Sequence, residues 1–532
     1  MLYSLRKSNF LLSMILPQSR KSTLAFWLAL GALAILLTIV YSLILQQHPY
    51  IAGSDLIYHT WFTGQILAHH AIPLSQPTQD VPSIYALTPF FHIVSAWVVG
   101  LLHLPVTQVM PWLTLLLIFT FILGLGYLAK LLTNDSKAGI FAIILYGVIQ
   151  TDFFEYLPRN FGIVEFILLS ILIIKYFSTT RMWQWKYLLP ITALAAGLIF
   201  THIFVAAFSF AIIAASVIGA LFLTKQRGHS LAILGVLAFA LALLLLRLET
   251  NPTLHTLNLN ASNQTSFMVA LGTYTPVPSP AVVDLSPKIW LLFFVIGIII
   301  AVWRWMRKGA SLVQIFGLSW LFCGVLFYVQ SIAGFNFLPD RSRILVQPVV
   351  TIYIAIGLFS LLPVLAQSIW KQKTVLALIA ATCLLVTARL YLSPNYLPSR
   401  SGISRTEANE YLHISQTVPS GSVVSDPITM YMLSSFSGMR PAYYFDHTNL
   451  TIARFSSWPE VHATFGGSDA AFYSWLTATR TKYVAVSFHT ASYVANANLS
   501  RIMHNPRFIL VYQSRATAPN GLPFYSIYRF GG

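Results

Sequence analysis

Long apolar runs fill the chain from residue 23 to residue 392, with short polar segments between them. Twelve windows are long and apolar enough, or nearly so, to form helices that span a bilayer. They lie at 23–46, 84–103, 110–132, 137–150, 161–178, 187–201, 203–224, 229–248, 288–306, 311–333, 344–366 and 372–392. The first window is longer than a signal-peptide core and has no small-residue cleavage pattern, so we interpret it as an uncleaved first span.

The composition supports a polytopic membrane protein and excludes a soluble one. Hydrophobic residues make up 56% of the 532 residues and charged residues only 9%, whereas about a quarter of a soluble domain is charged. The net charge of +17 does not indicate nucleic-acid binding, because the basic residues gather in short loops between apolar runs. Cys323 and Cys383 are the only cysteines and both lie in apolar runs, so we expect no disulfide framework and no cysteine metal site.

Basic residues indicate how many of the twelve windows cross the membrane. With the N-terminus in the cytoplasm and twelve spans, four basic clusters would lie outside, against the positive-inside rule. If the window 84–103 lies on the outer surface, all four return to the cytoplasm, and prolines and histidines do interrupt or bound this window. We therefore predict eleven spans, a cytoplasmic N-terminus and an extracytoplasmic C-terminus. The clusters are Arg181/Lys186, Lys225/Arg227, Arg304/Arg307/Lys308 and Lys371/Lys373.

The acidic residues of the membrane region gather on the outer side of this predicted topology. Nine acids precede residue 390, and only Asp135 falls in a cytoplasmic loop. Acidic residues contribute little to membrane topology, so the topology prediction, which used basic residues alone, is independent of where the acids lie. Their grouping on one side therefore indicates a functional site at the outer face. The other eight are Asp55, Asp80, Asp152, Glu155, Glu165, Glu249, Asp284 and Asp340.

From about residue 393 the composition becomes that of a soluble domain. We expect a helix over 404–416 that begins with a capping box of Ser404 and Glu407. Short runs of residues that favour β-structure predict strands at 422–425, 483–487, 508–512 and 524–528, and helices are expected near 427–438 and 468–479. The predicted fold is an all-α polytopic membrane domain over 1–392, with about eleven transmembrane helices and two surface helices in its first outer loop, followed by a small extracytoplasmic α/β domain over 393–532.

Asp55 and His59 stand out in the first outer loop. Asp55 could be the N-cap of a surface helix, or a general base whose pKa is raised in a partly dry pocket. His59 would face the same side of such a helix, where it could hold the carboxylate or contact a phosphate.

A second group of candidate residues runs from Asp152 to Arg159 in a short outer loop. Asp152 and Glu155 with Arg159 could share a divalent cation or orient a sugar. Alternatively, Arg159 could simply pair with Glu155. Glu165 lies inside an apolar span, where an ionisable group indicates function.

Three further polar residues lie at predicted outer ends of spans. His202 could be an ordinary helix-end residue or could stabilise a leaving group. Arg341 and Arg343 open the tenth span and would suit a phosphate, since guanidinium groups and free backbone N–H groups both favour an anion. Outward arginines also anchor helices at lipid headgroups.

The chain resembles the GT-C class of membrane glycosyltransferases, which use polyprenyl-phosphate-linked sugars and include protein mannosyltransferases, aminoarabinose transferases and oligosaccharyltransferase catalytic subunits. The segment from Gly53 to His59 sits where that class has its first-loop catalytic Asp. The segment from Tyr85 to His92 resembles the start of its second surface helix. The ending 524–529 is similar to the last strand of such outer domains.

The resemblance extends to the later motifs, with one departure. Asp152 and Glu155 fall where many members carry a second acidic motif, and Arg341 and Arg343 where members often have basic residues near the lipid phosphate. Members with a tight second motif have its acids one residue apart, whereas three residues separate them here, which weakens a metal role. If a divalent cation takes part, we expect Mg²⁺ or Mn²⁺, with Asp55, Asp152 and Glu155 as its candidate ligands.

The resemblance implies a hexosyl or pentosyl transferase that moves a sugar from a polyprenyl-phosphate carrier to a glycan, lipid or protein acceptor. Asp55 and His59 would be the catalytic residues at the outer face of a plasma membrane. The substrate-binding residues would be Asp152, Glu155, Arg159, Glu165, His202, Arg341 and Arg343. The alternative is a non-enzymatic transporter or flippase of lipid-linked sugars, and an inert assembly subunit is a weaker third possibility. A transporter would spread polar residues through the depth of its spans, whereas here they gather at the outer face.

Overall fold

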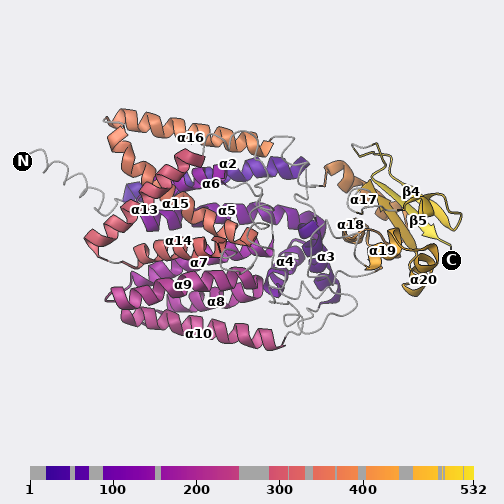
Figure 1. Cartoon of the computed structure of the whole chain (residues 1–532), viewed down its shortest axis with the longest axis horizontal. Coiled ribbons are helices and arrows are strands. Elements are labelled where there is room, and N and C mark those ends of the chain that lie inside the picture. The colour runs from indigo at the N-terminus through magenta and orange to yellow at the C-terminus, as the bar shows by residue number, and fades with distance from the viewer. Residues whose placement is uncertain are drawn as a thin grey trace, which may run out of the picture.

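The computed structural model shows a bundle of helices followed by a small sheet (Figure 1). The structure describes residues 20–47, 54–70, 88–149, 157–250, 287–309, 311–329, 339–365, 368–392, 403–442, 459–488, 490, 494, 498–518 and 521–531. The helices of the bundle within these ranges are α2 (Arg20–Gln47), α3 (Ser54–His69), α4 (Pro89–Leu102), α5 (Val106–Thr133), α6 (Ser136–Ile149), α7 (Pro158–Phe177), α8 (Trp185–Thr201), α9 (Ile203–Leu223), α10 (Arg227–Thr250), α13 (Pro287–Lys308), α14 (Leu312–Val329), α15 (Pro339–Leu365) and α16 (Ile369–Leu392).

The bundle is built from helices that suit a bilayer. In the described part of the chain, eight helices are long and apolar enough to cross a membrane: α2, α5, α7, α9, α10, α13, α15 and α16. Large apolar side chains cover its outside, and Leu189 and Phe222 are 69% and 76% exposed. Such surfaces are stable in lipid, where a helix also satisfies its own backbone. The chain is thus an integral membrane protein, as predicted.

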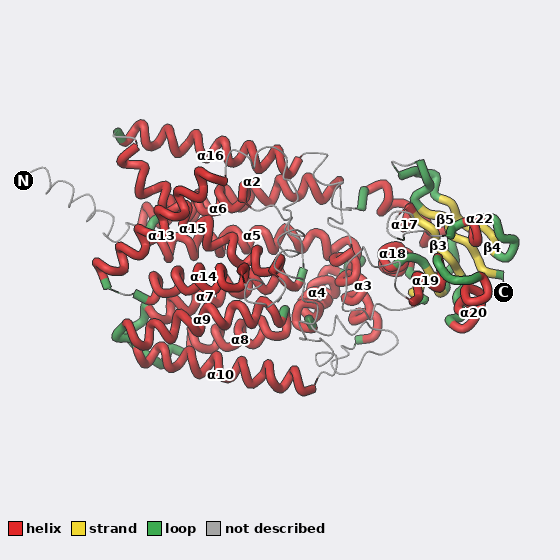
Figure 2. Tube along the Cα trace, viewed as in Figure 1, coloured by secondary structure: helices red, strands yellow, loops and turns green. Residues whose placement is uncertain are grey.

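Four shorter apolar helices leave the number of spans a prediction. They are α4, α6, α8 and α14. Adding α6, α8 and α14 to the eight long helices gives the predicted eleven. Helix α4 packs against α3, and both lie at the end of the bundle nearest the sheet (Figure 2).

The connections that carry basic clusters share one end of the bundle. The α7–α8, α9–α10, α13–α14 and α15–α16 connections all lie at the end away from the sheet (Figure 1). The four basic clusters lie in or beside these connections. The fold therefore groups the clusters as the charge argument predicted, and which side of the membrane they face stays a prediction.

Helices α13 and α15 pack through glycine. A Cβ added to Gly297 of α13 would lie 1.9 Å from the backbone oxygen of Tyr353, and one on Gly357 of α15 would lie 1.9 Å from that of Phe293. The two backbones can approach so closely only because both positions lack a side chain.

A five-stranded sheet forms after residue 421, and four of its strands lie at the places that the sequence predicted. Its order is β2-β1-β3-β5-β4, with β1 parallel to β2 and β3, and β5 antiparallel to β3 and β4. The strands are β1 (Ser422–Val424), β2 (Arg440–Pro441), β3 (Tyr483–Ser487), β4 (Phe508–Gln513) and β5 (Tyr525–Phe530). The two-residue β2 was not predicted, because it is too short to show a period.

Helices surround this sheet. They are α17 (Arg405–Thr417), α18 (Pro427–Ser437), α19 (Pro459–Phe465), α20 (Asp469–Ala478) and α22 (Ser500–Met503). The Ser404 hydroxyl accepts from Glu407 N at 3.1 Å, which confirms the predicted start of α17. The Glu407 carboxylate is buried beside the sheet, where its Oε1 accepts from the hydroxyl of Tyr525.

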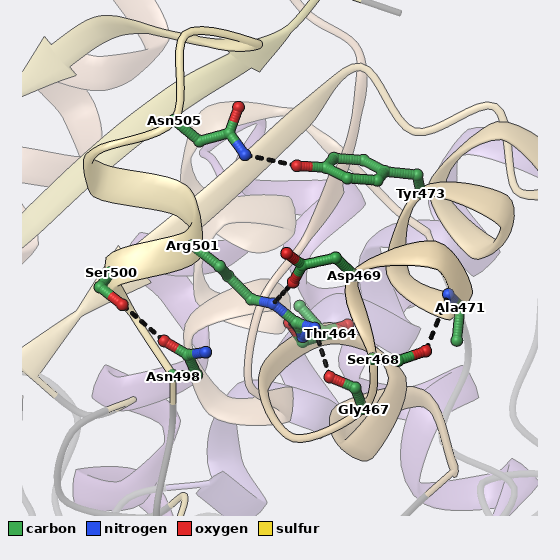
Figure 3. A network of polar contacts seen from close by, with 10 residues as sticks. All are labelled: Thr464, Gly467, Ser468, Asp469, Ala471, Tyr473, Asn498, Ser500, Arg501 and Asn505. Atoms are coloured by element: carbon green, nitrogen blue, oxygen red, sulfur yellow. Dashed lines mark hydrogen bonds and ion pairs between the residues drawn. The ribbon is translucent and has the colours of Figure 1, made fainter.

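Arg501 ties three of these helices together (Figure 3). Its Nε lies 3.2 Å from Asp469 Oδ1, Nη1 donates to Thr464 O at 3.3 Å, and Nη2 donates to Gly467 O. The guanidinium also stacks 4.7 Å from the Phe472 ring centroid. These bonds satisfy a buried arginine and hold α19, α20 and α22 together.

Candidate active site

Asp55 lies in the first turn of α3, because this helix begins at Ser54. Its side chain lies outside the described part of the structure. Helix α3 contacts α4 and α5 in the bundle and α18 beside the sheet. The segment singled out in the sequence therefore sits where the bundle meets the sheet domain.

His59 meets His92 between α3 and α4. His59 Nδ1 lies 3.2 Å from His92 Nε2, and the Thr63 hydroxyl lies 3.2 Å from His92 Nδ1. His92 and Thr63 are fully buried. The sequence had marked His92 as a polar interruption of an apolar window, but neither residue was predicted to belong to the site.

Aromatic rings enclose this histidine pair. The Phe62 ring lies edge-on to His92 with centroids 4.4 Å apart, and Phe91 lies 5.4 Å from His59. Burial lowers the pKa of His92 well below its usual range, and the neighbouring His59 lowers it further. His92 is therefore neutral at physiological pH.

Glu165 lies about two turns into α7, and only 5% of it is exposed. Its Oε2 has no hydrogen-bond partner among the described residues. A Cβ added to Gly197 of α8 would lie 3.1 Å from Glu165 Oε1 and 3.5 Å from the Phe90 ring of α4. Thr201, one turn further along α8, is also fully buried, and its side chain interacts with the Glu165 carboxyl. Polar groups of α7 and α8 thus lie buried beside α4.

Arg159 and His202 lie at helix ends of the same region. The sequence placed Arg159 in a loop, but it is the second residue of α7, because Pro158 takes the first helical position. Its Nε has no hydrogen-bond partner among the described residues. His202 joins α8 to α9 and caps α9, with its Nδ1 accepting from Val205 N at 3.4 Å.

The remaining predicted residues are located only in part. Arg341 and Arg343 lie in the first turns of α15, which begins at Pro339, and their side chains lie outside the described part of the chain. Asp152 and Glu155 lie wholly outside it. In the ranges that the structure describes, no three His, Cys, Asp or Glu side chains are grouped to hold a metal ion.

No protein-family model and no curated protein sequence matches the chain. Solved structures do match. The oligosaccharyltransferase AglB from Archaeoglobus fulgidus, in complex with an inhibitory peptide and a dolichol-phosphate, is 12% identical with a TM-score of 0.56, over 95% of this chain and 74% of AglB. ArnT from Cupriavidus metallidurans, bound to undecaprenyl phosphate, is 12% identical with a TM-score of 0.53, over 96% of this chain and 98% of ArnT.

A third match is the arabinofuranosyltransferase AftD from Mycobacteria, at 16% identity and a TM-score of 0.55. It covers 97% of this chain and 40% of AftD. All three are GT-C glycosyltransferases, and at these identities the likeness shows the fold. The chain has the fold of the GT-C class of membrane glycosyltransferases.

Proposed function

We propose that the chain is a membrane glycosyltransferase that moves a sugar from a polyprenyl-phosphate carrier to an acceptor at the outer membrane face. The observation that carries the proposal is the shared fold, which extends over nearly the whole chain. The matching AglB structure holds a dolichol-phosphate and the matching ArnT structure holds undecaprenyl phosphate.

The proposed reaction inverts the anomeric carbon of the sugar. The Asp55 carboxylate takes the proton of an acceptor hydroxyl or amide while the acceptor atom attacks that carbon. The bond between the carbon and the phosphate oxygen breaks, and the polyprenyl phosphate leaves with the electron pair. The position of Asp55 in the first turn of α3, at the junction of bundle and sheet, supports this role.

Arg341 and Arg343 are proposed to bind the phosphate of the carrier. They lie in the first turns of α15, where free backbone N–H groups and guanidinium groups together favour an anion. His202 is proposed to assist the departing phosphate from the α8–α9 junction. This charge stabilisation grows as the leaving group becomes more negative.

Sugar and acceptor are proposed to bind between these groups. The unpartnered Oε2 of Glu165, beside the Thr201 side chain, is suited to a sugar hydroxyl group. Asp152 and Glu155 precede α7 and Arg159 lies in its first turn, and all three would contact the same sugar. The contact between α18 and α3 supports a role of the sheet domain in holding the acceptor near Asp55.

The test is transfer of labelled sugar from a polyprenyl-phosphate donor in proteoliposomes. Asp55→Asn keeps the side-chain shape and removes the base, so transfer should fall by about 100-fold or more. Asp135→Asn is the matched control, since Asp135 lies in the α5–α6 connection, where its Oδ1 accepts from Lys137 N at 2.8 Å. Undiminished transfer by Asp55→Asn would exclude Asp55 as the base. Movement of the lipid-linked sugar across the bilayer without transfer would indicate the flippase.

A further inference from the structure

The hydroxyl of Thr63 determines the direction of the hydrogen bonds between α3 and α4. Thr63 is fully buried, so its hydroxyl proton needs an acceptor. Among the residues that the structure describes, its one hydrogen-bond partner is His92 Nδ1, at 3.2 Å. The proton is therefore donated to that nitrogen, which must be unprotonated.

The protonation of His92 in turn determines which atom donates the hydrogen bond between His92 and His59. A neutral imidazole with an unprotonated Nδ1 carries its proton on Nε2. His92 is neutral because it is fully buried and a second histidine faces it. Its Nε2–H consequently donates to His59 Nδ1, 3.2 Å away. His59 must then carry its proton on Nε2, the nitrogen that points away from His92.

We propose that Thr63 and His92 are positioning residues that hold His59 with its proton on Nε2, so that this nitrogen donates a hydrogen bond to an anionic oxygen of the reaction. The anionic oxygen belongs to the carrier phosphate or to the Asp55 carboxylate, which is one helical turn from His59. This inference rests on the proposed function for the identity of the anion. The proton positions themselves do not depend on it.

The surrounding rings keep this arrangement in place. Phe62 and Phe91 lie edge-on to His92 at 4.4 and 5.1 Å between centroids. They restrict the rotation of the ring that connects Thr63 to His59. Hydrogen-bond partners of this kind determine the tautomer of a functional histidine.

The direct test is nitrogen NMR of the full-length protein with ¹⁵N-labelled histidine in lipid nanodiscs. His59 and His92 are assigned from the signals lost in His59→Gln and His92→Gln. Both rings should show a protonated Nε2 and an unprotonated Nδ1. A proton on His59 Nδ1 in the unmodified protein would overturn the proposal.

Three threonine variants separate positioning from packing. Thr63→Val removes the donor, so both histidines should become tautomer mixtures and transfer should fall by about tenfold. Thr63→Ser keeps the hydroxyl and should retain both properties. Thr60→Val is the matched control, because the equally buried Thr60 hydroxyl donates to Leu56 O within α3. Equal effects of Thr63→Val and Thr60→Val would show a packing role and contradict the proposal.

The same NMR measurement distinguishes the source of the anion. A shift of the His59 Nε2 signal on adding polyprenyl phosphate identifies the phosphate, and a shift in Asp55→Asn without lipid identifies the carboxylate. No shift in either arm would contradict the proposed donation. Because these signals need no sugar transfer, they fail or succeed separately from the activity of Asp55→Asn.

Discussion

Glu165 is the residue whose environment departs furthest from ordinary packing. Glu165 is 5% exposed and lies inside a long apolar helix, and its Oε2 has no hydrogen-bond partner in the described ranges. Burial of such a carboxyl destabilises the folded state, because the group loses its hydration without gaining full compensation. Its neighbours include the Gly197 backbone and the Thr201 side chain. Such a position is expected where binding requires the carboxyl.

We predict that Glu165→Gln lowers transfer at least tenfold while the melting temperature stays equal or rises. The amide keeps the shape and removes a costly buried acid, but it replaces an acceptor oxygen with a donor. Transfer and thermal unfolding of the purified protein measure the two effects. Ser170→Ala on the same helix is the control, because the Ser170 hydroxyl donates to Phe166 O. Full transfer by Glu165→Gln would contradict a binding role.

The lowered pKa of His92 predicts a pH-dependent stability. The unfolded chain binds a proton at this residue below about pH 6.5, whereas the folded chain does not. The corresponding stability is therefore complete above that pH and is lost as the pH falls. His92→Gln should flatten the decrease in melting temperature between about pH 7 and about pH 5. An unchanged slope would mean that other groups dominate.

The sequence predicted single residues better than their partners. Glu165 was visible as a charge within an apolar run, and Asp55 as an acid at the start of a helical segment. The contact of His92 with Thr63 depends on how α3 packs on α4, and no local pattern encodes that packing. Glu407 shows the same limit, because its helix cap was predicted but its bond to Tyr525, from the last strand, was not.

At the scale of elements, α3 is held from two sides. It packs on α4 within the bundle and on α18 beside the sheet. Helix α18 is itself fixed by Asp426, whose Oδ1 accepts from Thr429 N at 3.0 Å and whose Oδ2 accepts from Thr490 at 2.6 Å. The start of α18 near 427 was predicted, but its contact with α3 could not be, because the two helices lie far apart in the chain.

The close packing of α13 on α15 predicts that a larger side chain at Gly297 destabilises the protein. Gly297→Ala places a Cβ 1.9 Å from Tyr353 O, so the helices must part, at a cost of about 1–3 kcal/mol or more. Gly235→Ala on α10 is the control, since nothing lies within 4 Å of its added Cβ. It should stabilise its helix by roughly 0.5–1 kcal/mol. Thermal unfolding should therefore separate the two variants, and equal melting temperatures would contradict the packing described.

At the scale of the whole molecule, the two ends of the helix bundle differ in the same way in basic charge and in structure. The four connections with basic clusters lie at one end of the bundle, and α3, α4 and the sheet lie at the other (Figure 1). The charge pattern predicted this grouping because each span reverses the chain, so one surface helix changes the side of every later loop. The pattern could not give the tilts and neighbours of the helices, which depend on side-chain packing.

The predicted orientation can be tested with two single cysteines in a protein that lacks Cys323 and Cys383. Ser368→Cys lies in the exposed α15–α16 connection and Ser415→Cys on the exposed face of α17. Because basic loops stay in the cytoplasm, a membrane-impermeant thiol reagent should label only Ser415→Cys in intact cells and both after permeabilisation. The reverse result would place α3 and Asp55 on the cytoplasmic side. The donor would then have to present its sugar to the inner leaflet, and the proposed outer-face reaction would be wrong even if Asp55 were the base.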